Sequence, residues 1–372
     1  MGAGRATGTR DRVVSGMGAS ESGDQTGPEP VEEHNVRRYD AANIGTADQF
    51  VRAAAALGIP VTAHEPLARH TTFRIGGPAD LYATATTTEQ LERLTELAAE
   101  HGIPITVVGG GSNVLVSDAG VRGLVVANQT RDYAWQTLAP AGATDAGSLA
   151  GNRPLSRRQL MADSGVLLAG LARTAIKAGF SGLEWAVSVP GTVGGAVIGN
   201  AGAYGSDIAG NLAEAIVTYP SLGRQTLTGA QMGFAYRSSL LKRQLASGIA
   251  RPVVLMAKFD LQPGDATALA ALAESYLARR RTSQPVEPSA GSIFRNPPGD
   301  HAGRLVEAAG LKGHRIGGAQ ISPRHANFIV NVEHARAADV RALLDLMRRR
   351  VLEDVGVELI PEILFMGEWH AA

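Results

Sequence analysis

The stretch from Trp185 to Ser206 constrains the fold of this chain more than any other. It is the longest run without a charged residue, and it contains six glycines, a proline and an asparagine. Glycine and proline at this density would break a membrane-spanning helix. We therefore predict loops whose backbone lies directly against a ligand.

Composition limits what that ligand and its surroundings can be. The chain has 372 residues, of which 44% are hydrophobic, enough for two or three domains with a sizeable core. Lys+Arg and Asp+Glu both number 35, so the formal net charge is zero. A neutral chain lacks the electrostatic footprint of a nucleic-acid or anionic-membrane binder. An anionic ligand must be met by local basic side chains or backbone amides.

The chain contains no cysteine. This excludes disulfides, thiolate metal sites, cysteine nucleophiles and cysteinyl attachment of a cofactor. It fits a reducing cytoplasm, where we expect the protein to be located. We expect no metal site, and nothing in the sequence implies an obligate protein partner.

Three regions follow from the pattern along the chain. Residues 1–45 lack hydrophobic periodicity and an apolar secretion signal, which predicts a disordered extension. Residues 46–262 alternate strands, turns and helices, with an Ala/Gly/Pro-rich stretch at 131–158 that we interpret as a surface insertion. The pattern changes near Pro263, so residues 263–372 are predicted to form a C-terminal domain.

Individual elements can be placed within these regions. A capping box at Thr86–Glu89 predicts a helix whose buried stripe is Leu91, Leu94, Leu97 and Ala98. Further helices are predicted over 165–178 and 266–281, and a last long helix is marked by Val340, Leu343, Leu344, Met347 and Val351. Strands are predicted at 105–108, 114–116, 124–126, 216–219, 226–228, 252–261 and 360–365.

Two glycine motifs are candidates for ligand contact. Gly109-Gly110-Gly111-Ser112-Asn113 follows an apolar strand, and its successive N–H groups can form an anion-binding nest. Its spacing is neither the GxGxxG of a dinucleotide-binding motif nor the GxxxxGK[ST] of a phosphate-binding loop. A tight turn is the competing interpretation. The second motif runs from Pro190 to Gly195 and on to Gly205, and leaves room for a flat ring system on its backbone. A structural loop inside a packed core is the alternative there.

Three polar residues are candidates for chemistry. Arg237, with Lys242 nearby, can clamp a carboxylate bidentately, although a surface arginine is the ordinary interpretation. Ser292 lies among small residues without a neighbouring base, which fits proton delivery better than nucleophilic attack, or an ordinary turn serine. Glu362 lies in an apolar stretch, where burial would raise its pKa and allow it to donate a proton, unless it faces water from an edge strand.

Taken together, seven segments resemble one family, that of UDP-N-acetylenolpyruvoylglucosamine reductase. They occur in the family's order: TTFRIGGPAD (71–80), GGGSNVLVSD (109–118), GLEWAVSVPGTVGGAVIGNAGAYG (182–205), FAYRSS (234–239), PSAGSIFRNP (288–297), AGLKGHRIGGAQIS (309–322) and PEILFMGE (361–368). Tyr276–Arg281 lead directly to the serine loop, as in the subgroup without a tyrosine-bearing insertion.

The resemblance implies an α+β fold, with an FAD-binding module of the vanillyl-alcohol-oxidase (PCMH) type followed by a smaller α/β substrate-binding domain. It implies non-covalent FAD, NADPH as reductant, and reduction of an enolpyruvyl UDP-sugar to UDP-N-acetylmuramate for peptidoglycan synthesis. Two alternatives stay open: an FAD-dependent oxidase of the same superfamily and a non-catalytic flavin-binding relic. The presence of Arg237, Ser292 and Glu362 argues against the relic.

The resemblance also assigns roles to individual residues. Ser292 is implied as the proton donor, and Arg237 and Glu362 as the groups that hold and polarise the substrate carboxylate. Tyr204, Asn296 and His325 match substrate contacts. The implied FAD contacts are Arg74, Gly109, Gly110, Gly111, Ser112, Asn113, Pro190, Gly191, Thr192, Gly194, Gly195 and Asn200.

Overall fold

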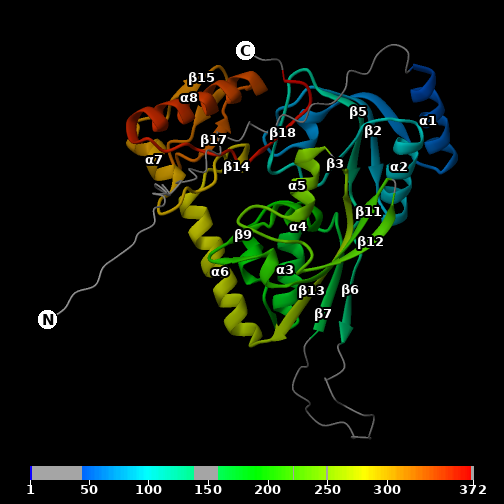
Figure 1. Ribbon diagram of the computed structural model, residues 1–372, viewed down its shortest axis with the longest axis horizontal. Coiled ribbons are helices and arrows are strands. Elements are labelled where there is room, and N and C mark those ends of the chain that lie inside the picture. The colour runs from blue at the N-terminus through cyan, green and yellow to red at the C-terminus, as the bar shows by residue number, and fades with distance from the viewer. Residues whose placement is uncertain (2–43, 138–157, 221, 249, 370–372) are drawn as a thin grey trace, which may run out of the picture. The chain divides into compact units, whose positions relative to one another are not determined.

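The computed structural model describes Met1 and residues 44–137, 158–220, 222–248 and 250–369. The predicted extension therefore lies outside the described residues, except that helix α1 (Ile44–Ala56) already begins within the range 1–45. Most of the predicted insertion, residues 138–157, also lies outside them. The described helices and strands belong to one compact unit, and Figure 1 shows their arrangement.

The first sheet contains both parallel and antiparallel strand pairs, and helices α1 and α2 (Thr88–Glu100) pack against it. Its strands, in spatial order, are β1 (Val61–Pro66), β2 (Pro78–Ala85), β5 (Val121–Asn128) and β3 (Ile105–Val108). The predicted stripe of α2 is buried, but the cap is Thr87, whose side chain accepts a hydrogen bond from the N–H of Gln90. The capping box predicted to start at Thr86 was thus one residue early, and Thr86 instead donates to the Gln90 side chain.

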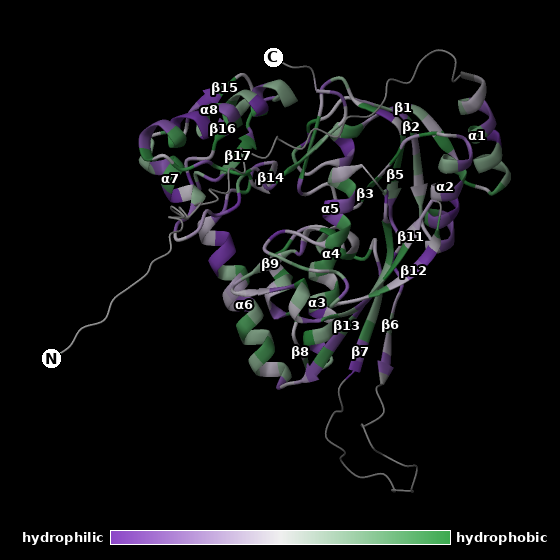
Figure 2. Cartoon of the chain, in the orientation of Figure 1, coloured by the Kyte–Doolittle hydropathy of each residue, from purple (hydrophilic) through white to green (hydrophobic). Residues whose placement is uncertain are grey.

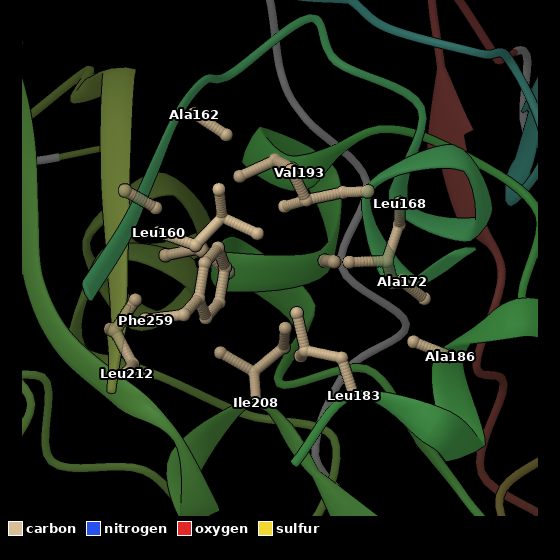
Figure 3. Close-up of a cluster of buried hydrophobic side chains, with 14 of the residues drawn as sticks. Leu160, Ala162, Leu168, Ala172, Leu183, Ala186, Val193, Ile208, Leu212 and Phe259 are labelled. Atoms are coloured by element: carbon tan, nitrogen blue, oxygen red, sulfur yellow. The ribbon is translucent and has the colours of Figure 1, made fainter. Parts of the chain in front are cut away.

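The second sheet is antiparallel and carries the largest core. Its strands, in spatial order, are β12 (Gly223–Thr228), β11 (Leu212–Tyr219), β13 (Val253–Pro263), β7 (Arg158–Asp163) and β6 (Tyr133–Thr137), with β8 (Phe180–Ser181) pairing β13. Figure 3 shows Phe259 of β13 and Leu160 of β7 packed with Val193 and Leu168. The latter two belong to helices α4 (Val193–Gly199) and α3 (Leu168–Lys177), which cover this sheet.

One expectation about this region was wrong, and a second was wrong at the two ends of its range. The glycine tract from Trp185 was predicted as loops, but it contains the short helix α4 and most of the 3-10 helix η3 (Glu184–Ser188). The stretch 131–158 was predicted as a surface insertion, but strand β6 near its start and the first residue of β7 at its end belong to the second sheet, and residues 138–157 lie outside the described residues. Figure 2 shows hydrophobic residues recurring along α3 and α4, which is why glycine-rich sequence can be helical here: its small side chains pack in the core.

A third sheet and two helices form the C-terminal part. The sheet is antiparallel, in the order β14 (Ser289–Ser292), β17 (Phe328–Asn331), β16 (Ala319–Ile321) and β15 (Arg315–Ile316). The helices are α7 (Ala302–Ala308) and α8 (Ala337–Val355), and all five marker residues predicted for the last helix are buried in α8. The remaining short elements are η2 (Leu67–His70), β9 (Gly202–Ala203), β10 (Ser206–Asp207), η4 (Ile208–Gly210) and α5 (Leu240–Ser247).

The C-terminal part is tied to the first half by two elements. Helix α6 (Ala266–Ser283) packs on η3 and α3, and its Leu269 and Ala273 belong to the core of the second sheet. This packing favours a boundary after Ser283, later than the one predicted near Pro263. The last strand, β18 (Leu364–Met366), returns to pair in parallel with β4 (Val114–Val116). It is shorter than the strand predicted at 360–365, which places Glu362 just before it.

Asp118 joins the two halves by capping a helix that lies far away in sequence. Its carboxylate oxygens accept hydrogen bonds from the N–H groups of Ala337 (2.8 Å) and Ala338 (3.0 Å), at the start of α8. Such N–H groups have no partner inside a helix, and a carboxylate there also meets the positive end of the helix dipole.

We predict that Asp118→Ala destabilises the protein by about 0.5–2 kcal/mol, the usual cost of losing a helix cap. The measurement is urea denaturation followed by circular dichroism. Asp48→Ala serves as the control, because Asp48 is exposed on α1 and caps no helix in the described part of the chain. Equal stability of the two variants would show that the cap contributes nothing to folding.

Candidate active site

A cavity of about 670 Å³ brings together residues from both halves of the chain. Its wall includes both glycine motifs, the start of β13, helix α5, the end of β14 and the segment leading into β18. The sequence-predicted residues in the wall are Gly109, Gly110, Gly111, Ser112, Asn113, Pro190, Gly191, Thr192, Gly194, Gly195, Arg237, Ser292 and Glu362.

The first glycine motif presents unpaired N–H groups to this cavity. Among the described residues, the N–H groups from Gly110 to Asn113 donate to no protein acceptor. Glycine is required here by packing as well: a Cβ on Gly111, at φ +57°, would lie 2.1 Å from the carbonyl oxygen of His70. A row of free N–H groups is the arrangement that binds phosphate oxygens.

The second glycine motif lies against the first, and parts of it are open toward the cavity. A Cβ on Gly110 would lie 3.1 Å from Cα of Gly191, so the two backbones touch. Gly194 is also closely packed, since a Cβ there would lie 2.9 Å from Cβ of Ser164. At Gly195, however, the nearest atom to a Cβ would be 3.8 Å away, which leaves space over the first turn of α4.

Arg237 and Glu362 form an ion pair in the cavity wall. The Arg237 Nε–H donates to Oε1 of Glu362 at 2.8 Å, and both side chains are about one-fifth exposed, 22% and 18%. The guanidinium also donates to the carbonyl oxygens of Gly202 (2.8 Å) and Asn200 (3.5 Å). Of the five N–H donors of a guanidinium, two are therefore left for a ligand.

Ser292 lies in the same wall, at the end of β14. The next residue, Ile293, is hydrogen-bonded to Glu362: its carbonyl oxygen accepts from the N–H of Glu362 at 2.8 Å. Among the described residues, no hydrogen-bond partner of the Ser292 hydroxyl is found. A serine hydroxyl that lies free in a cavity beside a cation can donate a proton to a bound molecule.

Five predicted contact residues lie outside the cavity wall. Arg74 is exposed and has φ +56°. The ring of Tyr204 stacks on Tyr276 at 4.1 Å and its hydroxyl donates to the Tyr276 carbonyl oxygen, which fastens α6. Asn200 is 2% exposed, and its side chain hydrogen-bonds to Asp207, Ala235 and Ala209.

The remaining two, Asn296 and His325, also have local partners. Asn296 accepts a hydrogen bond from the N–H of Ala302 at the start of α7. The Nδ1 of His325 accepts from the N–H of Asn327 at 3.2 Å, which leaves a proton for Nε2. Burial, together with the charge of Lys312, lowers the pKa of His325 and favours its neutral form.

Three cations in the wall were not predicted as site residues: Lys242, Arg251 and Arg280. Burial lowers the pKa of Arg280, and its guanidinium donates to the carbonyl oxygen of Ser188. The sequence offered little signal for Arg280, because it occurs in a run of three arginines on an ordinary helix. Asn128 and Ser164 also line the cavity and bond to each other at 2.7 Å.

Within the described part of the chain, no helix is long and apolar enough to cross a membrane. No group of three or more His, Cys, Asp or Glu side chains within that part is arranged to hold a metal ion.

Comparison with known proteins matches both halves of the chain. Residues 79–220 match the FAD binding domain family, and residues 284–366 match the C-terminal domain of UDP-N-acetylenolpyruvoylglucosamine reductase. The reductase of that name from Chloroflexus aggregans is 42% identical over 307 residues, covering 82% of this chain and 98% of the relative. That from Heliobacterium modesticaldum is 45% identical, covering 82% and 90%.

A solved structure agrees with these matches. The crystal structure of UDP-N-acetylenolpyruvylglucosamine reductase from Thermus caldophilus has a TM-score of 0.63 and 34% identity, covering 83% of this chain and 98% of that one. The predicted fold, an FAD-binding module followed by a smaller C-terminal domain, is confirmed. The chain belongs to the UDP-N-acetylenolpyruvoylglucosamine reductase family.

Proposed function

We propose that this protein reduces an enolpyruvyl UDP-N-acetylglucosamine to UDP-N-acetylmuramate, with FAD as cofactor and NADPH as reductant. The reaction supplies a peptidoglycan precursor, and we propose that it takes place in the cytoplasm. The observation that carries the proposal is the meeting of Arg237, Ser292 and Glu362 at one cavity, although they come from segments far apart in the sequence.

The residues of the cavity wall fit FAD. The free N–H groups of Gly110 to Asn113 suit a diphosphate, and the open space at Gly195 suits a flat ring. Pro190, Gly191 and Thr192 would complete the wall on the ring side. When bound, FAD supplies the two-electron transfer from NADPH to the enolpyruvyl group.

Arg237 is proposed to hold the substrate carboxylate with its two remaining N–H donors. Negative charge develops on the carbon next to the one that accepts hydride, and extends into this carboxylate. A cation that is already in place stabilises that charge without reorganisation. Glu362, by accepting from Nε, keeps the guanidinium plane fixed.

Ser292 is proposed to deliver the proton that completes the reduction. Its hydroxyl is free to point at a bound molecule, and it is joined through the backbone of Ile293 to Glu362. The proton goes to the carbon that carries the developing charge. The neighbouring Arg237–Glu362 pair orients the substrate, so that this carbon lies within reach of the hydroxyl.

We predict that the purified protein is yellow and releases FAD, not FMN, when denatured. Gly195→Leu should remain folded but lose most of its flavin, because the new side chain enters the space over α4. Absorbance at the flavin bands, relative to that of protein, measures the flavin content, and chromatography of the released flavin distinguishes FAD from FMN. Gly170→Leu, at an open helical position outside the cavity wall, is the control. Release of FMN, or a colourless protein that cannot be reconstituted with FAD, would refute the cofactor assignment.

We predict that Ser292→Ala separates the two half-reactions. Reduction of the flavin by NADPH needs no proton on a substrate carbon, so its rate should stay near that of the wild type. Reoxidation by the enolpyruvyl substrate should slow by about 10²–10⁴, the usual contribution of a positioned acid. Stopped-flow absorbance resolves both phases, and Ser275→Ala, on the exposed face of α6, is the control. Equal slowing of both phases would contradict the role of Ser292.

We predict that Arg237→Ala and Glu362→Gln also impair reoxidation, but in different ways. The arginine variant should raise the KM of the enolpyruvyl substrate and lower kcat, since the carboxylate is held in the ground state as well. The glutamine variant keeps an acceptor for the guanidinium, so its main effect should be on kcat. Steady-state kinetics distinguish the two, with Arg315→Ala, in a surface ion pair with Glu333, as the control. An unchanged KM for Arg237→Ala would rule out the carboxylate clamp.

A further inference from the structure

Arg237 occupies a backbone conformation that its residue type disfavours. Ala235 and Ser238 exchange two backbone hydrogen bonds of 3.0 Å, so Tyr236 and Arg237 are the central residues of a tight turn. Arg237 has φ +56°, in the left-handed region that favours glycine. A side chain in this conformation is strained, and the conformation persists only where the surroundings hold it in place.

Two buried side chains hold this turn, one at its first residue and one at its third. The Asn200 Nδ2–H donates to the carbonyl oxygen of Ala235 at 3.0 Å, and the Lys242 ammonium donates to the carbonyl oxygen of Arg237 at 3.2 Å. Asn200 is 2% exposed and Lys242 9%. The main-chain oxygen of Asn200 also accepts from the Arg237 guanidinium, so this residue contacts both the turn and the head of the arginine.

Both holding residues are themselves fixed by the helices that carry them. Asn200 ends α4 in the left-handed conformation, and its Oδ1 accepts from the N–H of Ala209 at 3.1 Å. Lys242 lies in the first turn of α5, whose cap residue Ser239 accepts from the Lys242 N–H. The Ser239 hydroxyl donates to the carbonyl oxygen of Ile198 at 2.7 Å, which joins α5 to α4.

We propose that Asn200 and Lys242 are positioning residues for Arg237. They keep its turn in the left-handed conformation, so that two guanidinium donors stay presented to the substrate carboxylate. The proposal rests on the proposed function, and it gives Asn200 a role different from the flavin contact implied by resemblance. Lys242 also lines the cavity, so direct contact with the substrate is the competing role that the experiment must separate.

The test is a double-mutant cycle between Lys242 and Arg237. Lys242→Met keeps the aliphatic stem and removes the ammonium. In the wild-type background it should lower kcat/KM for the enolpyruvyl substrate about tenfold to a hundredfold, as expected for a hydrogen bond from a charged group. In an Arg237→Ala background it should have almost no further effect, because residues that act through one another are not additive. Flavin content and circular dichroism are measured alongside.

Three further variants complete the experiment. Lys242→Arg should recover part of the lost activity, because a guanidinium can still donate to the Arg237 carbonyl. Lys258→Met is the matched control, since Lys258 pairs with Glu214 outside the cavity wall and should leave the kinetics unchanged. Should Lys242→Met fail to fold, Asn200→Gly takes its place in the cycle, because glycine keeps the left-handed backbone and removes only the side-chain hydrogen bonds.

The outcomes are distinguishable. Equal loss from Lys242→Met in both backgrounds would show that Lys242 acts directly on the substrate, and would overturn the positioning role. No loss in the wild-type background would overturn it as well. Failure of the wild-type protein to turn over the enolpyruvyl substrate would refute the proposed function instead, and with it the basis of this inference.

Discussion

The site depends on the pairing of the last strand with a strand near the start of the fold. β18 runs parallel to β4, with Leu364 opposite Val114 and Met366 opposite Val116. This register brings Glu362 next to Asn113, whose side-chain amide donates to the Glu362 carbonyl oxygen at 3.2 Å. Since β4 directly follows the first glycine motif, one short ladder places Glu362 beside the end of that motif. Arg237, 125 residues earlier, pairs with the Glu362 carboxylate in the wall of the cavity.

The glycines serve packing and ligand access in the same segments. A Cβ on Gly110 would meet the backbone of Gly191, one on Gly109 the side chain of Thr192, and one on Gly111 the backbone of His70, so the first motif is tightly packed against the second motif and against residue 70. Gly110, Gly111, Ser112 and Asn113 also line the cavity, and among the described residues their N–H groups donate to no backbone acceptor. Tight packing alone accounts for the glycines, and the anion nest stays a prediction.

Elements with a regular hydrophobic spacing could be predicted from the sequence. Helix α4 and strand β6, which lack such a pattern, could not. The strands at 105–108 and 114–116 and the buried stripe of α8 follow from hydrophobic spacing, which tertiary contacts here reinforce. Helix α4 was missed because Gly194, Gly195 and Gly199 disfavour a helix locally, and only packing against the second sheet stabilises it. Strand β6 was missed because the stretch around it looks like a loop in composition, although its pairing with β7 is regular.

The roles of motif residues were harder to predict than their proximity. Arg237, Ser292 and Glu362 do meet, but Asn200 and Tyr204 belong to the same motif as the second glycine tract and lie outside the cavity wall. Both have positive φ, and the side chains of both donate hydrogen bonds to main-chain oxygens of other segments. A motif conveys which residue types occur together, but it does not distinguish a residue that touches the ligand from one that holds the residue touching it.

Local charge explains how a neutral chain can bind anions. The cavity wall contains the cations Arg237, Lys242, Arg251 and Arg280, whereas Glu362 is the one carboxylate among its described residues. Glu362 is engaged with Arg237, so the wall as a whole stays positive. Diphosphates and a carboxylate are the groups that such a wall attracts, and the cost of burying Arg280 falls when one of them is bound. The zero net charge of the sequence thus conceals a concentration of positive charge at the one place where the proposed cofactor and substrate carry their negative groups.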